Sequence, residues 1–250
     1  CGRCPAPPVL PWSPNGSDVT DPVPGLCLLI NKPLEWTSFD VVNKLRYSLK
    51  IKKIGHAGTL DPLATGLLII CTGPMTKKIN EYQGMEKEYT GTFTLGYTTP
   101  SCDLETAPEN PRDTSHITPD LLAATAAEFT GIIQQIPPIH SSVMVNGKRA
   151  YSLARKGQVP ELQAREVEIK KFDIIDISMP VVSFRVVCSK GTYIRSLARD
   201  FGEKLNTGAY LSSLCRTRIG PYLLDDAMTI EQARMKFGPS PLPHENLPQP

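Results

Sequence analysis

The sequence predicts an α+β (mixed α/β) fold, and three kinds of pattern lead to that class. Several segments alternate apolar and polar side chains with the period of two that is typical of β-strands. Other segments begin with a helix-capping residue and continue with the apolar spacing of an amphipathic helix. The pair Asn146-Gly147 is a strong hairpin signal and adds an antiparallel component. Strands and helices are therefore mixed along one globular chain.

In the first half of the chain, apolar runs and capping residues define four elements. A short apolar run predicts a strand over 26–30, and a longer one predicts a buried strand over 67–71. Thr37 or Ser38 can cap a helix that ends near residue 48. Alternation predicts a strand over 88–97.

A helix follows these elements and opens the second half of the chain. Thr118 with Pro119 predicts its start, and Gly131 ends it. The remaining expected elements are a strand over 142–145 before the hairpin turn, strands over 167–177 and 181–188 that Pro180 separates, a helix over 192–205, a strand over 210–219, and a short last helix with a Thr229–Gln232 capping box.

The distribution of proline divides the chain into three parts. Residues 1–24 contain seven prolines and few large apolar side chains, which predicts a disordered leader. Residues 238–250 contain five more prolines and are expected to form a flexible tail. Residues 25–237 form the expected globular domain, without internal repeats.

Composition narrows the classes of function. The net charge of +2 is only mildly basic, so binding of nucleic acid would depend on where the charge lies. No apolar run approaches the ~20 residues of a membrane helix, and no signal-peptide pattern is present, so we expect a cytoplasmic protein. The seven cysteines form no disulfide framework, and only Cys1 and Cys4 have metal-ligand spacing. We therefore expect a reducing compartment, no disulfides and no metal.

The most informative stretch is residues 55–66, Gly-His-Ala-Gly-Thr-Leu-Asp-Pro-Leu-Ala-Thr-Gly. It holds one carboxylate, Asp61, among glycines that permit tight turns, and Pro62 restricts Asp61 to extended geometry. An apolar run follows, so Asp61 is expected on a rigid loop that leads into a buried strand. An active-site carboxylate is one interpretation. A turn residue that bonds its own backbone is the commoner one for these residues alone.

Basic residues precede this loop. The stretch 41–60 contains no acid, and its five cations are Lys44, Arg46, Lys50, Lys52 and Lys53. A solvated helix face is the usual explanation for such a run. A surface that holds a phosphate backbone is an equally good explanation here.

Two further groups of residues have functional and ordinary interpretations. In 189–195, Ser-Lys-Gly-Thr-Tyr-Ile-Arg, the start of a helix favours anions, and Arg195 beside a buried aspartate would keep that aspartate ionised. The ordinary alternative is a surface helix in which Arg199 pairs with Asp200. Tyr89 and Tyr97 could hold a flipped base or simply pack into the core.

The order of these motifs resembles the TruB family of tRNA pseudouridine synthases over roughly residues 25–230. The strongest motif is Gly-Thr-Leu-Asp-Pro-Leu-Ala-Thr-Gly at 58–66. Lys-Glu-Tyr at 87–89, Pro137-Pro138 followed by Gly-Lys-Arg-Ala-Tyr at 147–151, and the 189–195 segment appear in the family's order. The resemblance implies conversion of uridine to pseudouridine in the T-loop of tRNA, at position 55, without metal or organic cofactor.

The resemblance also implies roles for individual residues and a fold. The implied fold is a mixed, largely antiparallel sheet flanked by helices. Asp61 would be the catalytic aspartate, Tyr89 would stack on the target base, and Arg195 would pair with Asp61. The implied substrate-binding residues are His56, Tyr193, Leu214, Lys190, Asp103, Lys52 and Lys53.

The sequence departs from the family in two places and leaves two other functions open. A C-terminal PUA domain, which many bacterial members carry, is expected to be absent, and no glycine follows Asp103. We expect a monomer that acts on the T-loop and T-stem of tRNA. An RNA-binding or RNA-folding module would need the basic residues but not Asp61. A small-molecule glycosidase or phosphorylase would usually need a second carboxylate as acid, and no second acid stands in a comparable motif.

Overall fold

The computed structural model describes residues 25–139, 141, 144–145, 148–149 and 162–239. The expected leader over 1–24, most of the expected tail and the expected turn at Asn146-Gly147 lie outside this part of the chain. The two short strands that flank the turn, β6 (Met144–Val145) and β7 (Lys148–Arg149), are described and pair antiparallel.

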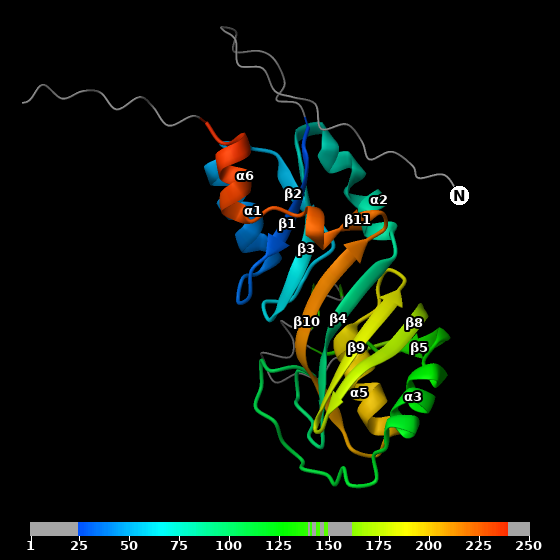
Figure 1. Cartoon of the computed structure of the whole chain (residues 1–250). Helices are drawn as coiled ribbons and strands as arrows, with labels where there is room; N and C mark the ends of the chain where they lie inside the picture. Colours follow the sequence, from blue (N-terminus) through cyan, green and yellow to red (C-terminus); the bar gives the residue numbers. More distant parts are fainter. Residues whose placement is uncertain (1–24, 140, 142–143, 146–147, 150–161, 240–250) are drawn as a thin grey trace, which may run out of the picture.

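A mixed sheet of nine strands runs through the whole domain (Figure 1). The strand order is β1-β3-β10-β4-β9-β8-β5, while β2 pairs with β3 and β11 pairs with β10. Within this sheet β3 and β10 are parallel and the other pairs are antiparallel. Its strands are β1 (Cys27–Lys32), β2 (Ile54–Ala57), β3 (Ala64–Thr72), β4 (Lys87–Leu95), β5 (Gly131–Gln135), β8 (Arg165–Ser178), β9 (Val181–Cys188), β10 (Ala209–Ile219) and β11 (Tyr222–Leu223).

Helices flank the sheet, and local capping explains the starts of the first and last of them. Thr37 caps the first helix in a capping box with Asp40, and Thr229 does the same for the last helix with Gln232. The helices are α1 (Ser38–Ser48), α2 (Ile79–Gly84), α3 (Pro119–Glu128), α5 (Ile194–Lys204) and α6 (Ile230–Phe237), with 3₁₀ turns η1 (Gly73–Lys78) and η2 (Leu224–Asp226).

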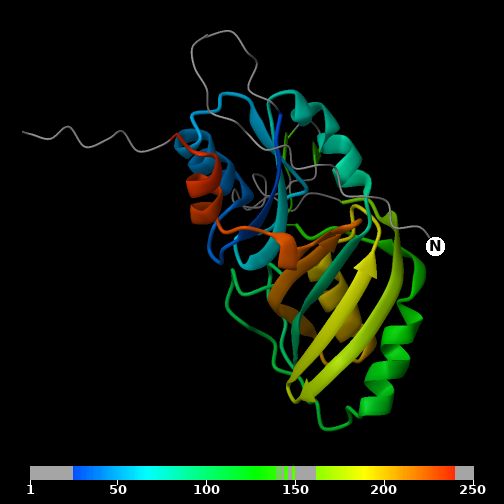
Figure 2. The same ribbon diagram turned by 45° about the horizontal axis from the view of Figure 1, so that its top comes forward.

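The apolar side chains form three clusters along the sheet. Helices α3 and α5 cover β4, β8 and β9 with an aromatic core, in which the rings of Phe93 and Phe184 stack at 4.1 Å. Helices α1 and α6 pack beside each other against β1 and β3 (Figure 2). The third cluster, with Leu67 and Ile69, lies on the opposite face of β3. Because β3 is buried on both faces, its sequence is an unbroken apolar run.

Strand β3 pairs with two different strands along one edge, and the loop that carries Asp61 lies where they separate. At its start β3 pairs with β10 through residues 64–66, and further along it pairs with β2 through residues 69–72. The connection from β2 to β3 therefore leaves the sheet where two neighbouring strands separate. Asp61 lies on this connection.

The fold agrees with the expected class and its mixed, largely antiparallel sheet, and the differences are local. Strands β2 and β5 and helix α2 were not expected, since the short segment 54–57 has no clear period and Gly131 was expected only to end a helix. Helix α3 ends at Glu128, before Gly131, and Gly131 with a φ of 107° begins β5. Helix α5 begins at Ile194 rather than at Thr192.

Candidate active site

The loop that carries Asp61 is held by buried polar side chains from other elements. The Ser38 hydroxyl accepts a hydrogen bond from the Leu60 N–H at 2.8 Å and lies 3.1 Å from the Leu60 carbonyl, to which it donates. The Lys32 ammonium, which is fully buried, donates to the Pro62 carbonyl at 3.2 Å. Both residues adjacent to Asp61 are therefore fixed, so Asp61 has little freedom to move.

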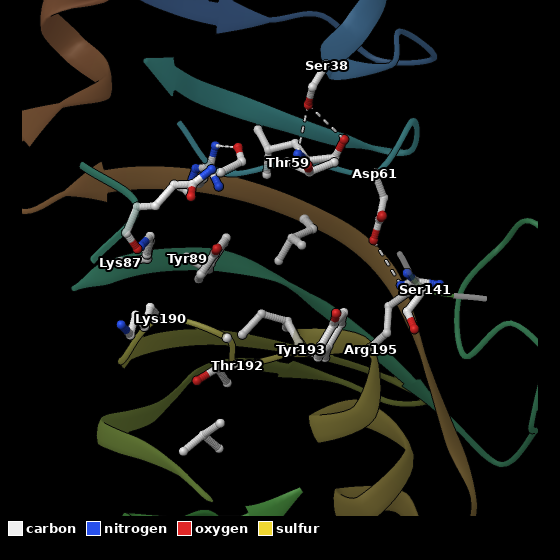
Figure 3. Close-up of a pocket in the computed structure, with 18 of the residues that line it drawn as sticks. Ser38, Thr59, Asp61, Lys87, Tyr89, Ser141, Lys190, Thr192, Tyr193 and Arg195 are labelled. Atoms are coloured by element: carbon white, nitrogen blue, oxygen red, sulfur yellow. Dashed lines mark hydrogen bonds and ion pairs between the residues drawn. The ribbon is translucent and has the colours of Figure 1, made fainter. Parts of the chain in front are cut away.

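Asp61 faces a cavity of about 1310 Å³ between this loop, β4, β10 and the segment before α5 (Figure 3). The cavity brings together seven of the residues that the sequence singled out, although they come from distant parts of the chain. These residues are His56, Asp61, Tyr89, Lys190, Tyr193, Arg195 and Leu214.

A buried arginine joins two carboxylates at one end of the cavity. The Arg195 Nε lies 2.9 Å from Asp61 Oδ2, and its Nη1 lies 3.6 Å from Asp103 Oδ2 (Figure 3 shows the first pair). The side chains of Arg195 and Asp103 are each 5% exposed, whereas that of Asp61 is 40% exposed. Asp61 is thus the carboxylate that a bound molecule can reach, and Asp103 lies behind it.

Burial and Arg195 act on the acidity of Asp61 in opposite directions. We expected Arg195 to keep Asp61 ionised, and its guanidinium does act to lower the pKa of the Asp61 carboxyl. Burial is the larger effect and raises that pKa above its usual value. The negative charge of Asp103 adds to the rise. The carboxylate is therefore a stronger base and a better acceptor for positive charge than an ordinary aspartate.

Two tyrosines and a leucine line the cavity beside Asp61. Tyr89 extends from β4, and Tyr193 stands at the start of α5 (Figure 3). The backbone of Tyr193 is fixed by the Gln135 amide, which accepts from its N–H at 2.8 Å and donates to its carbonyl at 3.1 Å. Leu214 of β10 completes this apolar lining. Flat aromatic and aliphatic surfaces of this kind suit a planar base.

The helix start that was expected to favour anions lies at Ile194, and one nearby N–H group is already bonded within the protein. Gly191 and Thr192 precede α5, and the Tyr193 N–H is used by Gln135. The ordinary interpretation holds for Arg199, whose Nε bonds Asp200 Oδ1 at 2.8 Å.

The basic residues occupy two different places. Lys190 is exposed at the cavity, while Lys52 and Lys53 are exposed at the far end of β2 from Asp61 and do not line the cavity. The Lys53 carbonyl accepts from the Gly73 N–H at 2.8 Å, which brings η1 with its exposed Lys77 and Lys78 to the same end. Together these exposed lysines form a basic surface that is larger than the sequence indicated. Its residues are Lys52, Lys53, Lys77 and Lys78.

His56 lies inside the cavity as a neutral imidazole. Burial and the nearby Arg216 lower the pKa of His56 below its usual value. Its Nδ1 is buried and has no hydrogen-bond partner among the described residues.

The sequence analysis missed several residues of the site. Lys32, Ser38, Lys87 and Arg216 are buried, and their polar groups bond to main-chain carbonyls or to the Asp61 loop. Their signal was weak, because a lysine or arginine in a strand is usually exposed. Within the described residues no cluster of His, Cys, Asp and Glu could hold a metal, and no helix there has the length and apolarity to cross a membrane.

Two solved structures share the fold of this chain. A chain in the crystal structure of a Cbf5-Nop10-Gar1 complex matches 84% of this chain with a TM-score of 0.66 and 29% identity. This chain spans 53% of that one. A further match, at 26% identity and a TM-score of 0.63, is the structure of an H/ACA RNP bound to a substrate RNA containing 2′-deoxyuridine. The fold, the aspartate in an aromatic pocket, and relatives at 53% and 54% identity that are named pseudouridine synthases together define a pseudouridine synthase, which is an isomerase.

Sequence comparison identifies the family within this class. The family model for the N-terminal domain of TruB family pseudouridylate synthases matches residues 46–194. The tRNA pseudouridine synthase B of Parabacteroides distasonis is 53% identical over 85% of this chain and 93% of its own length. The enzyme of the same name from Flavobacterium johnsoniae is 54% identical over 82% of this chain and 93% of its own. The chain belongs to the TruB family.

Proposed function

We propose that residues 25–237 isomerise uridine to pseudouridine at position 55, in the T-loop of tRNA, with Asp61 as the catalytic carboxylate. One observation carries this proposal. Asp61 is the reachable carboxylate of the Asp61–Arg195–Asp103 group, and it faces a cavity lined by Tyr89, Tyr193 and Leu214. The relatives named tRNA pseudouridine synthase B support tRNA as the substrate.

The reaction needs a negative charge close to the sugar. The bond from uracil N1 to ribose C1′ breaks, the uracil turns, and C5 then bonds to C1′. The proton from C5 leaves and N1 gains one, so product and substrate are isomers. Breaking the first bond develops positive charge on the ribose, as in glycoside hydrolysis. The Asp61 carboxylate can stabilise that charge or bond to the carbon.

The cavity explains how the detached base is retained. Tyr89, Tyr193 and Leu214 offer apolar surfaces on which uracil can turn without leaving. Because these positions lie inside a cavity, the target nucleotide must leave the RNA stack to reach Asp61. His56, whose Nδ1 is buried and unpartnered among the described residues, would contact the extruded nucleotides. Asp103 would order Arg195 from behind.

Mapping of pseudouridine in an unmodified tRNA tests the proposed position. The protein is incubated with the transcript, and carbodiimide adducts are located by primer extension. We expect a single new adduct, at position 55, and none when that uridine is replaced by cytidine. Modification elsewhere would overturn the T-loop assignment. Binding of tRNA without any pseudouridine would favour an RNA-binding module instead.

Removing two lysines tests the basic surface separately from the chemistry. We expect Lys52→Ala with Lys53→Ala to weaken tRNA binding and to reduce the slope of log K against log salt by about one to two, because fewer counterions are released. Lys204→Ala is the matched control, since Lys204 pairs with Glu128 on another surface. The measurement is a titration at several salt concentrations. An unchanged slope would remove these lysines from the interface.

The oligomeric state and the cellular location are further parts of the proposal. We propose a monomer in the cytoplasm, where unmodified tRNA is present. Sedimentation of the protein alone and with tRNA tests the first of these statements, and a dimer in both states would contradict it.

A further inference from the structure

We propose that Arg216 is a positioning residue for the reaction, which holds the Asp61 loop and Tyr89 in one fixed arrangement. The proposal rests on the catalytic role of Asp61. Neither the sequence motifs nor the Asp61–Arg195 pair indicates a function for Arg216. A function is indicated by its place in the sheet, where β10 and β2 separate along β3.

Arg216 fills the gap where β10 and β2 separate along β3. Its Nε donates to the Leu67 carbonyl at 2.8 Å, and its Nη2 donates to the Gly58 carbonyl at 2.9 Å. Gly58 follows β2 and Leu67 lies within β3, just past the residues that pair with β10. One guanidinium therefore ties together both sides of the loop that carries Asp61.

Arg216 is buried, and its backbone is packed tightly against β3. Gly66 lies against the Arg216 backbone, and a Cβ added there would stand 2.4 Å from the Arg216 carbonyl oxygen. Arg216 itself is 1% exposed. This close approach of β3 to β10 explains why a glycine with φ of 100° stands at position 66.

The Arg216 guanidinium also lies close to Tyr89, on the β4 side of the cavity. Arg216 stands directly opposite Tyr89 in the pairing of β10 with β4. The guanidinium lies beside the Tyr89 hydroxyl and acts against the effect of burial, which raises the pKa of Tyr89. Arg216 thus fixes the distance between the phenol and the loop that carries Asp61.

A positive charge at position 216 is not needed merely to connect the strands. None of the ion pairs found among the described residues includes Arg216. Its guanidinium instead donates hydrogen bonds to the two main-chain carbonyls. Burying a cation without a carboxylate is costly. A neutral side chain would pack here at lower cost, and only a planar donor with several N–H groups can bond both carbonyls and reach the phenol. We therefore attribute the arginine at position 216 to the arrangement of the site and not to the stability of the fold.

Two variants and a rescue test this role. Arg216→Lys keeps the charge but cannot bond both carbonyls, and Arg216→Ala opens a space toward the cavity that guanidinium ion can enter. We expect both to slow single-turnover pseudouridine formation by about 10- to 100-fold, because small displacements of reacting groups have effects of that size. The dissociation constant for tRNA is expected to change by less than about threefold, since the RNA-facing lysines are intact.

Added guanidinium separates positioning from folding. Millimolar guanidinium is expected to restore Arg216→Ala at least about fivefold and to leave Asp61→Asn unchanged, since it can occupy only the space of the missing group. The matched control is Arg218→Met, which removes the next arginine of β10, a residue bonded to Glu86 outside the cavity. It is expected to keep the parent rate.

Several outcomes would overturn the role of Arg216. They are a parent-like rate in either variant, a loss of rate that matches an equal loss of binding, a rate loss in Arg216→Ala without rescue, or loss of the folded state in both variants. An active Asp61→Asn protein would instead refute the catalytic assignment of Asp61. An inactive Asp61→Asn beside a fully active Arg216→Lys would refute only the inference about Arg216.

Discussion

Asp61→Asn is expected to lower the single-turnover rate of pseudouridine formation by about 10³-fold or more, the upper end for loss of one electrostatic contact in an active site. The amide keeps the shape of the carboxylate and fits the same loop, but it carries no negative charge for the developing positive charge on the ribose. Release of tritium from uridine labelled at C5 gives the rate directly.

Binding should separate from catalysis in this variant. Because phosphate contacts dominate affinity for RNA, Asp61→Asn is expected to bind tRNA within about threefold of the parent. Asp200→Asn is the matched control, since Asp200 pairs with Arg199 on α5 away from Asp61. A rate for Asp61→Asn near that of this control would show that another group performs the chemistry.

Arg195→Met should have the second largest effect, because it damages catalysis and stability together. Without the guanidinium, the pKa of Asp61 rises further, and Asp61 spends less time ionised. We expect the rate at neutral pH to fall by about 10²-fold or more, as for loss of a group that orients a catalytic one. Two carboxylates would also remain close together, with Asp103 almost fully buried.

The cost in stability can be measured by urea unfolding. Breaking a buried ion pair typically costs about 3–5 kcal/mol, and the lower end is expected here because Asp61 is partly exposed. Arg199→Met, one turn further along α5, breaks a half-exposed pair and should cost less than about 1 kcal/mol. Equal losses for the two variants would mean that Arg195 has no special place in the structure.

The sequence predicted those parts of the fold and site that depend on neighbouring residues. Thr37 and Thr229 defined helix starts through local capping. The alternation in 88–97 defined strand β4, and Pro180 marked the boundary before strand β9. The family motifs predicted that Asp61, Tyr89 and Arg195 share one site, and the cavity contains all three.

Features that depend on distant contacts were not predictable. Arg216 lies in a strand where an arginine would ordinarily be exposed, and only the separation of β10 from β2 shows why it is buried. The acidity of Asp61 depends on the balance between burial and Arg195, which no spacing in the sequence reveals. The basic surface near Lys53 includes η1, which lies alongside because β3, the strand before η1, pairs with β2.

The pH dependence of the single-turnover rate tests most directly whether an ionised Asp61 performs the reaction. The pKa of Asp61 is raised, so activity should be complete above that pKa and fall about tenfold per pH unit below it, with a midpoint above the ordinary carboxyl value of 3.8. Asp103→Asn should move the midpoint to lower pH, because the Asp103 charge raises the pKa of Asp61. A rate that does not fall on acidification while tRNA stays bound, or a midpoint that Asp103→Asn leaves in place, would contradict this account.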